Sequence, residues 1–412
     1  MKFKKTTFEE RQIALELLPN IAFMQCREVV EEAIGEAGKI MLSAILQASA
    51  EELTGPPRRG KRVGGSGVRH GTQPGSVFLG ASKVGVERPR VRSGTGKGSG
   101  ELKIPAYEML RTDEGACKNV HKAVLSGLST RKFEPAMAAG LKAAGVSKSS
   151  VSRRCIKEGG RQLEEFQSRA VPLDLVAMLL DGTHLDEYCF VTAVGIDSKG
   201  NKHALGFAEG TTENAAVVGD VLKNLRDRGV DYGKKLLFVT DGSKAIKAAI
   251  REICGSKHPI QRCRVHKKGN VLDRLPEAKK PYVKAAMNAA WKLRPEQGIQ
   301  QMKKLAAELR VSHPDAANSL LEGLEDTFTV NKLGLSPMLV VSLATTNLIE
   351  NPHGAIKNAL RRTKTYKDID QAKRWLASVL LEAERNFRTL KGHKDIWMLQ
   401  AALGQHTEEE AV

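Results

Sequence analysis

Two aspartates each come at the end of a strongly apolar run and directly before a glycine. Asp181 lies in the segment LVAMLLDGT and Asp241 in the segment LLFVTDGS. Apolar runs of this length are typical of a strand buried on both faces, and Asp-Gly is a common turn pair. Two interpretations follow. Either each aspartate simply forms a turn, or each is held at a strand end to bind a cation, because an ionised carboxylate is costly to bury without compensation.

On neighbouring strands, these aspartates would direct two carboxylates at one point on the carboxyl-terminal edge of a sheet. Carboxylates so placed repel each other, and a divalent cation such as Mg²⁺ or Mn²⁺ would relieve the repulsion. In phosphodiester chemistry, two ions about 3.5–4 Å apart can activate the attacking oxygen and stabilise the leaving one. Two ions require a third carboxylate. Glu350 is our candidate, because it lies on a predicted helix with Lys357 and Arg361 roughly on the same face.

A cysteine and a histidine follow the second aspartate in C-x-x-H spacing, as Cys263 and His266. The pair could be half of a zinc site, but no two further ligands at matching spacing lie nearby. We therefore expect a supporting role, with the cysteine in the last strand of the sheet and the histidine near the mouth of the site. Close to the first aspartate, His184 and Asp186 are weaker candidates, and Thr183 is interpreted as a turn hydroxyl.

The elements that would position these residues begin near residue 173. Three apolar strands joined by short turns, a helix over 213–228, a strand, a helix and a final strand HPIQRCRVH predict a mixed sheet with helices packed on it. Residues 276–336 are rich in Ala and Lys and predict helices. They carry Trp291, which is interpreted as a core residue, with stacking on a flipped base as the alternative.

The amino-terminal part has two characters. Residues 7–52 have apolar residues at helical spacing. Residues 57–97 hold ten Lys or Arg, ten Gly and one acid, a composition that buries little surface and is costly to order. This segment fits either a solvated linker or a basic arm that follows a phosphate backbone, and alternation over 76–92 predicts a small hairpin.

Residues 112–168 predict a helix, a short turn at Gly145 and a second helix, which is the helix-turn-helix arrangement. Ser129 and Ser147 suit the two helix caps, whereas Pro135 fits poorly inside the first helix. The second helix would present side chains suited to DNA, namely Ser149, Ser150, Arg153, Arg154 and Lys157. The alternative is an ordinary helical pair with basic solvent faces.

The overall charge favours a polyanionic partner. Among 412 residues, 65 Lys and Arg exceed 47 Asp and Glu, which gives a net charge of +18. Nucleic acid fits first and an anionic membrane second, with a basic surface that has no such partner as the alternative. Six scattered cysteines do not suggest a disulfide framework. Without an apolar stretch of 18 residues or a signal peptide, we expect no membrane association and a cytoplasmic location.

The motifs LLDGTH, VTDGSKAIKAAI, CRVH and TTNLIE followed by RR together resemble the Mutator-type bacterial insertion-sequence transposases. The resemblance spans about residues 65–385, and the upstream VSKSSVSR and LSTRKFE resemble that family's DNA-binding half. It implies an RNase H-like catalytic domain with a DDE triad of Asp181, Asp241 and Glu350 that binds metal. It also implies that the C-x-x-H pair is a family feature and that residues 276–336 are a helical insertion.

One segment departs from the family pattern. Members carry a run of the type R-x-N-R-x-I-[KR] after the glutamate, and here the sequence reads ENPHGAIKNALRR. This puts the geometry next to Glu350 in doubt. The basic residues that remain after it, and that we assign to DNA, are Lys357, Arg361 and Arg362.

The expected fold is thus a mixture of α+β and α/β: an RNase H-like catalytic domain with a helical insertion, preceded by a helix-turn-helix-like DNA-binding region. The predicted division is an N-terminal helical region (1–56), a basic Gly-rich arm (57–110), the DNA-binding region (111–170), the first part of the catalytic core (171–275), the insertion (276–336), and the second part of the core with C-terminal helices (337–412).

The expected function is that of a DNA transposase. It would bind the terminal inverted repeats of its element, cut DNA with two Mg²⁺ or Mn²⁺ ions, and join the freed end to target DNA, working as a homodimer or larger assembly on the prokaryotic chromosome. Two alternatives stay open. One is a nuclease of the same fold without strand transfer, and the other is a DNA-binding repressor whose acids are structural.

Overall fold

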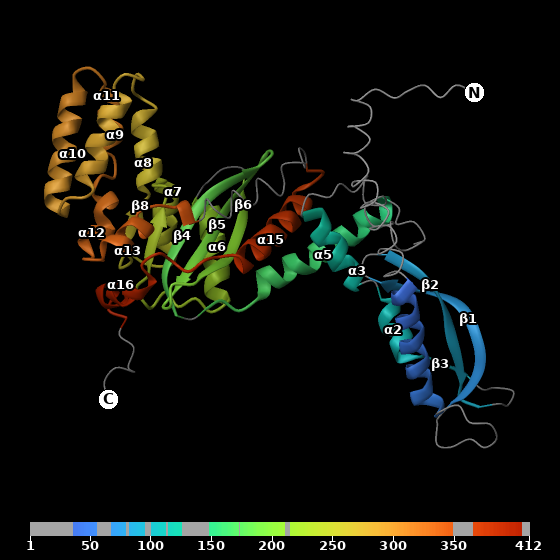
Figure 1. The fold of residues 1–412 in the computed structure, drawn as a ribbon. Helices are drawn as coiled ribbons and strands as arrows, with labels where there is room; N and C mark the ends of the chain where they lie inside the picture. The colour runs from blue at the N-terminus through green and yellow to red at the C-terminus, as the bar shows by residue number, and fades with distance from the viewer. Residues whose placement is uncertain are drawn as a thin grey trace, which may run out of the picture. The chain divides into compact units, whose positions relative to one another are not determined.

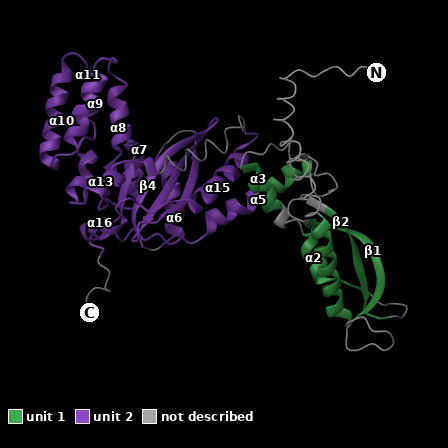
Figure 2. Cartoon of the chain, viewed as in Figure 1, with its two compact units in different colours: residues 1–158 green, residues 159–412 purple. Residues whose placement is uncertain are grey.

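The structure is a computed structural model, and it describes residues 36–55, 67–79, 82–94, 100–112, 114–125, 148–172, 174–210, 215–348 and 366–405. The chain forms two compact units, Met1–Glu158 and Gly159–Val412, which are described separately (Figure 2). None of the helices in the described ranges is long and apolar enough to cross a membrane.

The first unit is built on a three-stranded antiparallel sheet (Figure 1). Strands β1 (Val68–Leu79) and β2 (Ser82–Arg92) form a hairpin, and the short β3 (Glu101–Leu102) pairs with β2. A helix over residues 36–54 and α2 (Pro105–Arg111) share a core with this sheet. The predicted hairpin is confirmed and is longer than expected.

The expectation that the Gly-rich segment buries little surface is wrong for this hairpin. Val77, Val84 and Val91 are at most 2% exposed. Val77 lies opposite Val84, so alternation places them on one face. Val77 and Val91 pack with Leu46 from the preceding helix. The helix and the arm, which the sequence suggested as separate regions, are therefore held together by one core.

Helices α3 (Glu114–Leu125) and α5 (Lys148–Ser168) follow in the chain. Helix α5 confirms that the chain is helical after Ser147, as predicted, and the helix-turn-helix arrangement stays a prediction. The predicted first helix and turn, with Ser129, Pro135 and Gly145, lie outside the described residues.

The second unit contains a five-stranded mixed sheet in the order β6-β5-β4-β7-β8 (Figure 1). The strands are β4 (Leu175–Leu185), β5 (Tyr188–Asp197), β6 (Lys202–Gly210), β7 (Leu237–Thr240) and β8 (Ile260–Arg262). The first three pair antiparallel, whereas β4 with β7 and β7 with β8 pair parallel. The predicted mixed sheet is confirmed.

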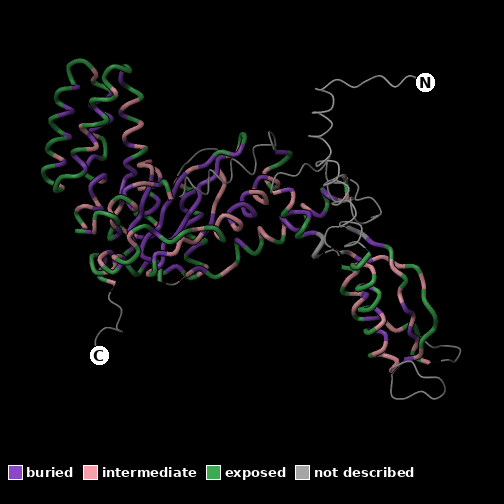
Figure 3. The backbone as a smooth tube through the Cα atoms, in the orientation of Figure 1, coloured by how far each residue is buried: buried purple, intermediate pink, exposed green. Residues whose placement is uncertain are grey.

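Helices cover both faces of this sheet. Helices α6 (Ala215–Asp227) and α7 (Lys244–Ile253) pack on the side chains of one face, such as Leu180 and Phe238. Helices α13 (Pro337–Leu343) and α16 (Ile396–Leu403) pack on the other, which includes Leu179 and Val239. A sheet covered twice needs apolar side chains on both sides, which explains the unbroken apolar runs. In Figure 3 most of this sheet is drawn as buried.

Helix α15 (Ile369–Arg385) lies beside β6, where Lys373 bonds Glu209 at 2.7 Å. A 3₁₀ turn, η2 (His393–Asp395), precedes α16.

A helical segment follows the last strand. It comprises α8 (Arg264–Leu272), α9 (Lys280–Ala290), α10 (Pro295–Arg310), α11 (Pro314–Leu321), the 3₁₀ turn η1 (Glu325–Phe328) and α12 (Thr329–Lys332). These elements have a core of their own, which includes Met287, Leu305 and Phe328. The predicted helical character of residues 276–336 is confirmed.

Two predicted strand ends are wrong. Strand β4 does not turn at Asp181, because its pairing with β5 continues to Leu185 opposite Tyr188. The turn comes instead at Asp186, whose φ of 57° is in the left-handed region that aspartate tolerates. Strand β8 ends at Arg262, and α8 begins two residues later.

Candidate active site

Asp181 and Asp241 occupy equivalent positions on neighbouring parallel strands. Leu180 of β4 lies opposite Thr240 of β7, so the aspartates that follow them come next in register. Asp181 lies within β4 and is 6% exposed, whereas Asp241 follows the end of β7 and is half-buried. The two aspartates therefore follow a register pair of neighbouring parallel strands, at a point where β7 ends and β4 continues. Their convergence on one metal site stays a prediction.

A tight turn fixes Asp241. Its Oδ1 accepts a hydrogen bond from the backbone N–H of Ser243 at 2.8 Å. Gly242 has a φ of +100°, and a Cβ at that position would lie 2.1 Å from Nε of Arg262. Only glycine fits here, for reasons of both backbone conformation and space.

Asp181 is held by the sheet instead. Oγ1 of the fully buried Thr192 on β5 donates to the backbone carbonyl of Asp181 at 3.2 Å. Thr183 is 4% exposed within β4, so its interpretation as a turn hydroxyl is wrong. His184 and Asp186 are exposed at the far end of the strand.

Cys263 and His266 lie beside the two carboxylates. Cys263 directly precedes α8 rather than lying in a strand, and its backbone N–H donates to the carbonyl of Thr240 at 2.7 Å. Its Sγ accepts hydrogen bonds from the N–H and Oγ1 of Thr346 at 3.3 and 3.4 Å. Nδ1 of His266 lies 3.3 Å from the same hydroxyl. These contacts join the start of α8 to the segment that leads toward Glu350.

The electrostatics of this group favour a protonated histidine. The hydrogen bond to Cys263 raises the pKa of His266 to about 9 despite burial, and the negative charges of Cys263, Asp181 and Asp241 contribute. Burial opposes ionisation of Cys263, but hydrogen bonds from His266 and Thr346 outweigh it and lower the pKa of the thiol.

The third predicted carboxylate cannot be placed. Glu350 lies outside the described residues, as do Lys357, Arg361 and Arg362. Within the described ranges, no group of three or more His, Cys, Asp or Glu residues could hold a metal ion. The described part of the site thus contributes two carboxylates, from β4 and from the end of β7.

The predicted DNA-reading side chains of α5 differ in exposure. Arg153 and Lys157 are exposed. Arg154 is 7% exposed, and its guanidinium carbon lies 4.7 Å from the ring centroid of Phe78, so in this arrangement it packs against the hairpin. Its role in reading DNA stays a prediction.

The arginines of the hairpin are largely paired with acids. Arg88 and Arg90 both reach Glu101, at 3.2 and 3.3 Å, and Arg69 reaches Glu51 at 3.1 Å. The hairpin therefore presents less uncompensated charge than its composition suggests.

A buried basic cluster escaped the sequence analysis. Arg262, which is 6% exposed, donates through Nη1 to the carbonyl of Glu322 at 2.6 Å. Lys267 is fully buried and donates to the carbonyls of Ser319 and Glu322 near the end of α11. Burial, followed by the charge of Arg262, lowers the pKa of Lys267 to about 7. The signal was the basic run RCRVHKK, which was interpreted as part of a strand and its flank.

Comparison with known proteins identifies the family. The family model described as "Transposase, Mutator family" matches residues 9–389, nearly the whole chain. The chain belongs to the Mutator family of transposases.

Its curated relatives in this family are distant in sequence. The transposase for insertion sequence element IS905 of Lactococcus lactis is 24% identical over 376 residues, which cover 88% of this chain and 89% of that relative. The transposase for IS6120 of Mycolicibacterium smegmatis is 27% identical over 274 residues, covering 61% and 83%. The transposase for IST2 of Acidithiobacillus ferrooxidans is 25% identical over 201 residues, covering 46% and 67%.

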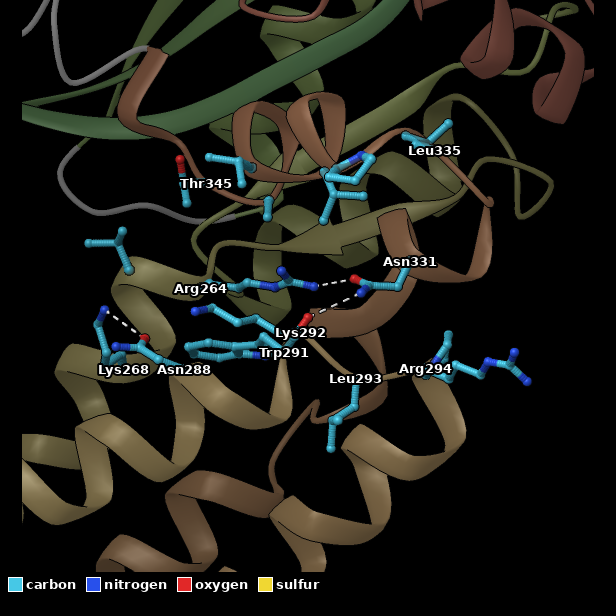
Figure 4. A pocket seen from close by; sticks show the side chains of 16 residues that line it. Arg264, Lys268, Asn288, Trp291, Lys292, Leu293, Arg294, Asn331, Leu335 and Thr345 are labelled. Carbon is cyan, nitrogen blue, oxygen red and sulfur yellow. Dashed lines mark hydrogen bonds between the residues drawn. The ribbon is translucent and has the colours of Figure 1, made fainter.

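A cavity of about 720 Å³ in this transposase is lined by residues that include Arg264 and Thr345, which are chain neighbours of Cys263 and Thr346 (Figure 4). It is lined by residues of α8, of the α9–α10 connection, of α12 and of α13, and by Thr345. Trp291 forms part of its lining and is 6% exposed, with Nε1 donating to Oγ1 of Thr327 at 3.1 Å. This burial supports the interpretation of Trp291 as a core residue.

Proposed function

We propose that this chain is an insertion-sequence transposase that cuts and joins DNA strands with divalent metal ions. In this proposal Asp181, Asp241 and Glu350 are the catalytic and metal-binding residues. The observation that carries it is the register of β4 and β7, in which Asp181 and Asp241 directly follow the paired residues Leu180 and Thr240. A role in turn formation does not account for Asp181, because β4 does not turn at that residue.

The sheet topology supports an RNase H-like catalytic domain. Three antiparallel strands continue into two parallel ones in the order β6-β5-β4-β7-β8, with helices on both faces. This is the arrangement that the sequence resemblance implies, with the first acid on the central strand and the second at the end of its parallel neighbour. A helical insertion then separates the second aspartate from Glu350, which follows α13 in the chain.

The described residues fit a divalent metal ion. Carboxylate oxygens are the ligands that Mg²⁺ and Mn²⁺ prefer, and such sites usually take one or two carboxylates together with phosphate oxygens. Bound there, the ions would stabilise the negative charge that develops on the phosphate oxygens as a phosphodiester bond breaks. Glu350 would complete the ligand set for two ions.

The protein's own groups position the reaction. Strand β5 and the Ser243 N–H hold the two aspartates in place. In this proposal His266, whose pKa the hydrogen bond to Cys263 raises to about 9, supplies a positive charge next to them, and Thr346 contacts its ring. A cation at this point can contact a phosphate group of the bound strand.

DNA is the proposed partner, both as terminal inverted repeats and as target. The net charge of +18 favours binding to a polyanion, and Arg153, Arg154, Lys157, Lys357, Arg361 and Arg362 are the proposed contacts. Bringing two element ends together requires at least a dimer on DNA.

The test is cleavage of a duplex that carries one end of the element, with Mg²⁺ present. Asp181→Asn, Asp241→Asn and Glu350→Gln should each abolish cleavage and leave DNA binding nearly intact. Asp220→Asn, at an exposed aspartate on α6, is the matched control and should cut normally. Normal cutting by all three site variants would contradict the assignment.

The same assay separates the alternatives. Cleavage without joining to a target duplex would indicate a nuclease of this fold. Specific DNA binding by the unmodified protein without any cleavage would indicate a repressor.

A further inference from the structure

We propose that Arg262 is a positioning residue of the transposase, and that through it the helical insertion holds in place the turn that carries Asp241. The inference rests on the proposed function, in which Asp241 binds metal, and it adds that the insertion takes part in fixing the geometry of that site. It is carried by the place of the Arg262 side chain between two turns and by the burial of one of its nitrogens.

The register of the sheet places Arg262 beside the Asp241 turn. Arg262 ends β8 and pairs with Thr240, the residue before Asp241. The next residue, Cys263, donates its backbone N–H to the Thr240 carbonyl at 2.7 Å. Strand β8 is therefore paired up to the last residue of β7, and the Arg262 side chain begins one position away from the acid.

The stem of the Arg262 side chain is packed against this turn. A Cβ on Gly242 would lie 2.1 Å from Nε of the arginine, and 2.7 and 2.8 Å from its Cδ and Cγ. Gly242 directly follows Asp241 and has a φ of +100°. Because Arg262 is only 6% exposed, its neighbours hold the stem in this place, and the turn cannot move toward it without a clash.

The guanidinium group of Arg262 is bound by the insertion. Nη1 donates to the carbonyl of Glu322 at 2.6 Å, and Nη2 lies 3.4 Å from the Glu322 carboxylate. Gly323, with a φ of +57°, leaves room for this group, because a Cβ there would lie 2.8 Å from Nη1. Arg262 therefore joins the turn after β7 to the turn after α11.

The helix that follows Asp241 is tied to the same part of the insertion. Lys247 of α7 forms an ion pair with Asp326 of η1, and the exposed Lys244 lies 3.6 Å from Glu322. Exposed ion pairs of this kind contribute little stability each. They show that α7 and the insertion lie against each other, and the buried Arg262 is the contact that reaches the turn itself.

One nitrogen of Arg262 is buried at a cost. Its Nε has no hydrogen-bond partner within the part of the chain that the structure describes. A buried donor left in this way lowers stability, and replacing a buried charge by a well-packed apolar side chain is often neutral or stabilising. Stability alone therefore does not account for an arginine at this position. A link between the two turns does, because it needs a long side chain with donors at its far end.

The proposed role fixes the sign of the effect on metal binding. Mg²⁺ demands near-ideal octahedral geometry, so a displaced Asp241 carboxylate weakens its binding. Removing the positive charge of Arg262 would by itself favour a nearby cation. Because the two effects are opposite, weaker metal binding after loss of the Arg262 side chain indicates lost positioning.

The first experiment measures binding of Mn²⁺ to the full chain without DNA, from the electron paramagnetic resonance signal of the free ion. Arg262→Met should weaken binding by about tenfold, as is typical when a group that orients a metal ligand is removed. Arg264→Met is the matched control and should bind Mn²⁺ like the unmodified protein. Arg264 is 9% exposed and also binds the insertion, at the Thr327 carbonyl, but its guanidinium lies over the Trp291 ring.

The second experiment changes the insertion alone. Gly323→Ala displaces the Arg262 guanidinium, so it should raise the Mg²⁺ concentration needed for half-maximal cleavage of the end duplex. The increase should be absent in the Arg262→Met background, where the displaced group is missing. Gly334→Ala is the control for backbone strain and should leave the Mg²⁺ dependence unchanged. Gly334 also has a positive φ, +68°, but an added Cβ there meets nothing within 4 Å.

Three results would overturn the positioning role. The first is Mn²⁺ binding by folded Arg262→Met that equals or exceeds that of the unmodified protein. The second is equal weakening in Arg262→Met and Arg264→Met, and the third is an equal Mg²⁺ shift in Gly323→Ala and Gly334→Ala. If circular dichroism shows that Arg262→Met does not fold, the two glycine variants decide.

The unmodified protein distinguishes such a failure from a failure of the proposed function. If it neither binds Mn²⁺ nor cuts DNA, the proposed metal site is wrong and the role of Arg262 falls with it. If it cuts, and Arg262→Met and Gly323→Ala cut with the same Mg²⁺ dependence, the proposed function stands and only the role of Arg262 is contradicted.

Discussion

Strands β4 and β7 carry the same Asp-Gly pair but use it differently. After β7 the pair follows the end of the strand, and Gly242 adopts a φ of +100° with no room for a side chain. In β4 the strand runs on for four residues past Asp181, and the aspartate is buried in mid-strand. What the two regions share is the register and not the turn. This teaches that the aspartates are placed by the pairing of parallel strands, and that the glycines serve separate local needs.

The third parallel strand, β8, sharpens the contrast. Asp181 lies within β4 and Asp241 follows β7, whereas β8 ends at Arg262 and is followed by Arg264 and Lys267. The sheet edge therefore changes from negative to positive across three strands, and the positive side binds the carbonyl groups near the end of α11.

The largest expected effect comes from lengthening each aspartate. Asp181→Glu places an extra methylene in a buried mid-strand position, so we expect cleavage to fall by more than about a hundredfold, beyond the usual loss for a supporting contact. Asp241→Glu lies after a strand end and half-exposed, so it should retain measurably more activity. Initial cleavage rates with Mg²⁺ test this. Equal losses of activity in the two variants would contradict the difference between the two strands.

The two glycines should differ in stability. Gly242→Ala combines a left-handed φ with a clash against Arg262, so we expect it to lower the free energy of unfolding by about 2–3 kcal/mol. Gly182 is not among the described glycines with positive φ, so Gly182→Ala should cost less. Urea denaturation of the two variants is the measurement, and a larger loss for Gly182→Ala would contradict the account.

The buried Lys267 should make the stability of the protein depend on pH. Burial lowers the pKa of Lys267 to about 7, against about 10.4 in the unfolded chain. Between these values the unfolded chain binds more protons, so stability rises with pH. We expect the free energy of unfolding of the unmodified protein to rise by on the order of 1–2 kcal/mol relative to that of Lys267→Met between pH 7 and 9.

The control for this prediction is Lys303→Met at an exposed position of α10. Its stability should follow that of the unmodified protein across the same range. If the stability of Lys267→Met followed that of the unmodified protein at every pH, the pKa of Lys267 would not be lowered in the folded state.

The smallest expected effect concerns the support of Asp181. Thr192→Val removes one buried hydrogen bond to the Asp181 carbonyl, so we expect about 1 kcal/mol less stability. Asp241 has no equivalent dependence, since its support comes from the Ser243 backbone. Thermal unfolding of Thr192→Val and of the exposed control Thr72→Val measures this, and equal shifts would remove the assigned role.

Sequence patterns predicted the strands and the meeting of the two aspartates because unbroken apolar runs mark a doubly covered sheet. Sequence patterns did not predict the strand ends that depend on contacts with residues far apart in the chain. Pairing with β5 carries β4 past Asp181, and a hydrogen bond from the Arg264 N–H to the Ala344 carbonyl draws the chain away from β8. The burial of Arg154 against Phe78 depends likewise on a contact between residues far apart in the chain. Local periodicity carries no information about such partners.

The central claim is that Asp181, Asp241 and Glu350 hold the same metal ions. Fe²⁺ can replace Mg²⁺ at such a site and, with ascorbate, generates hydroxyl radicals that cut the polypeptide nearby. The account predicts three cuts, near residues 181, 241 and 350, all suppressed by excess Mg²⁺. Cuts near the two aspartates but none near residue 350, or no cuts that Mg²⁺ suppresses, would contradict it.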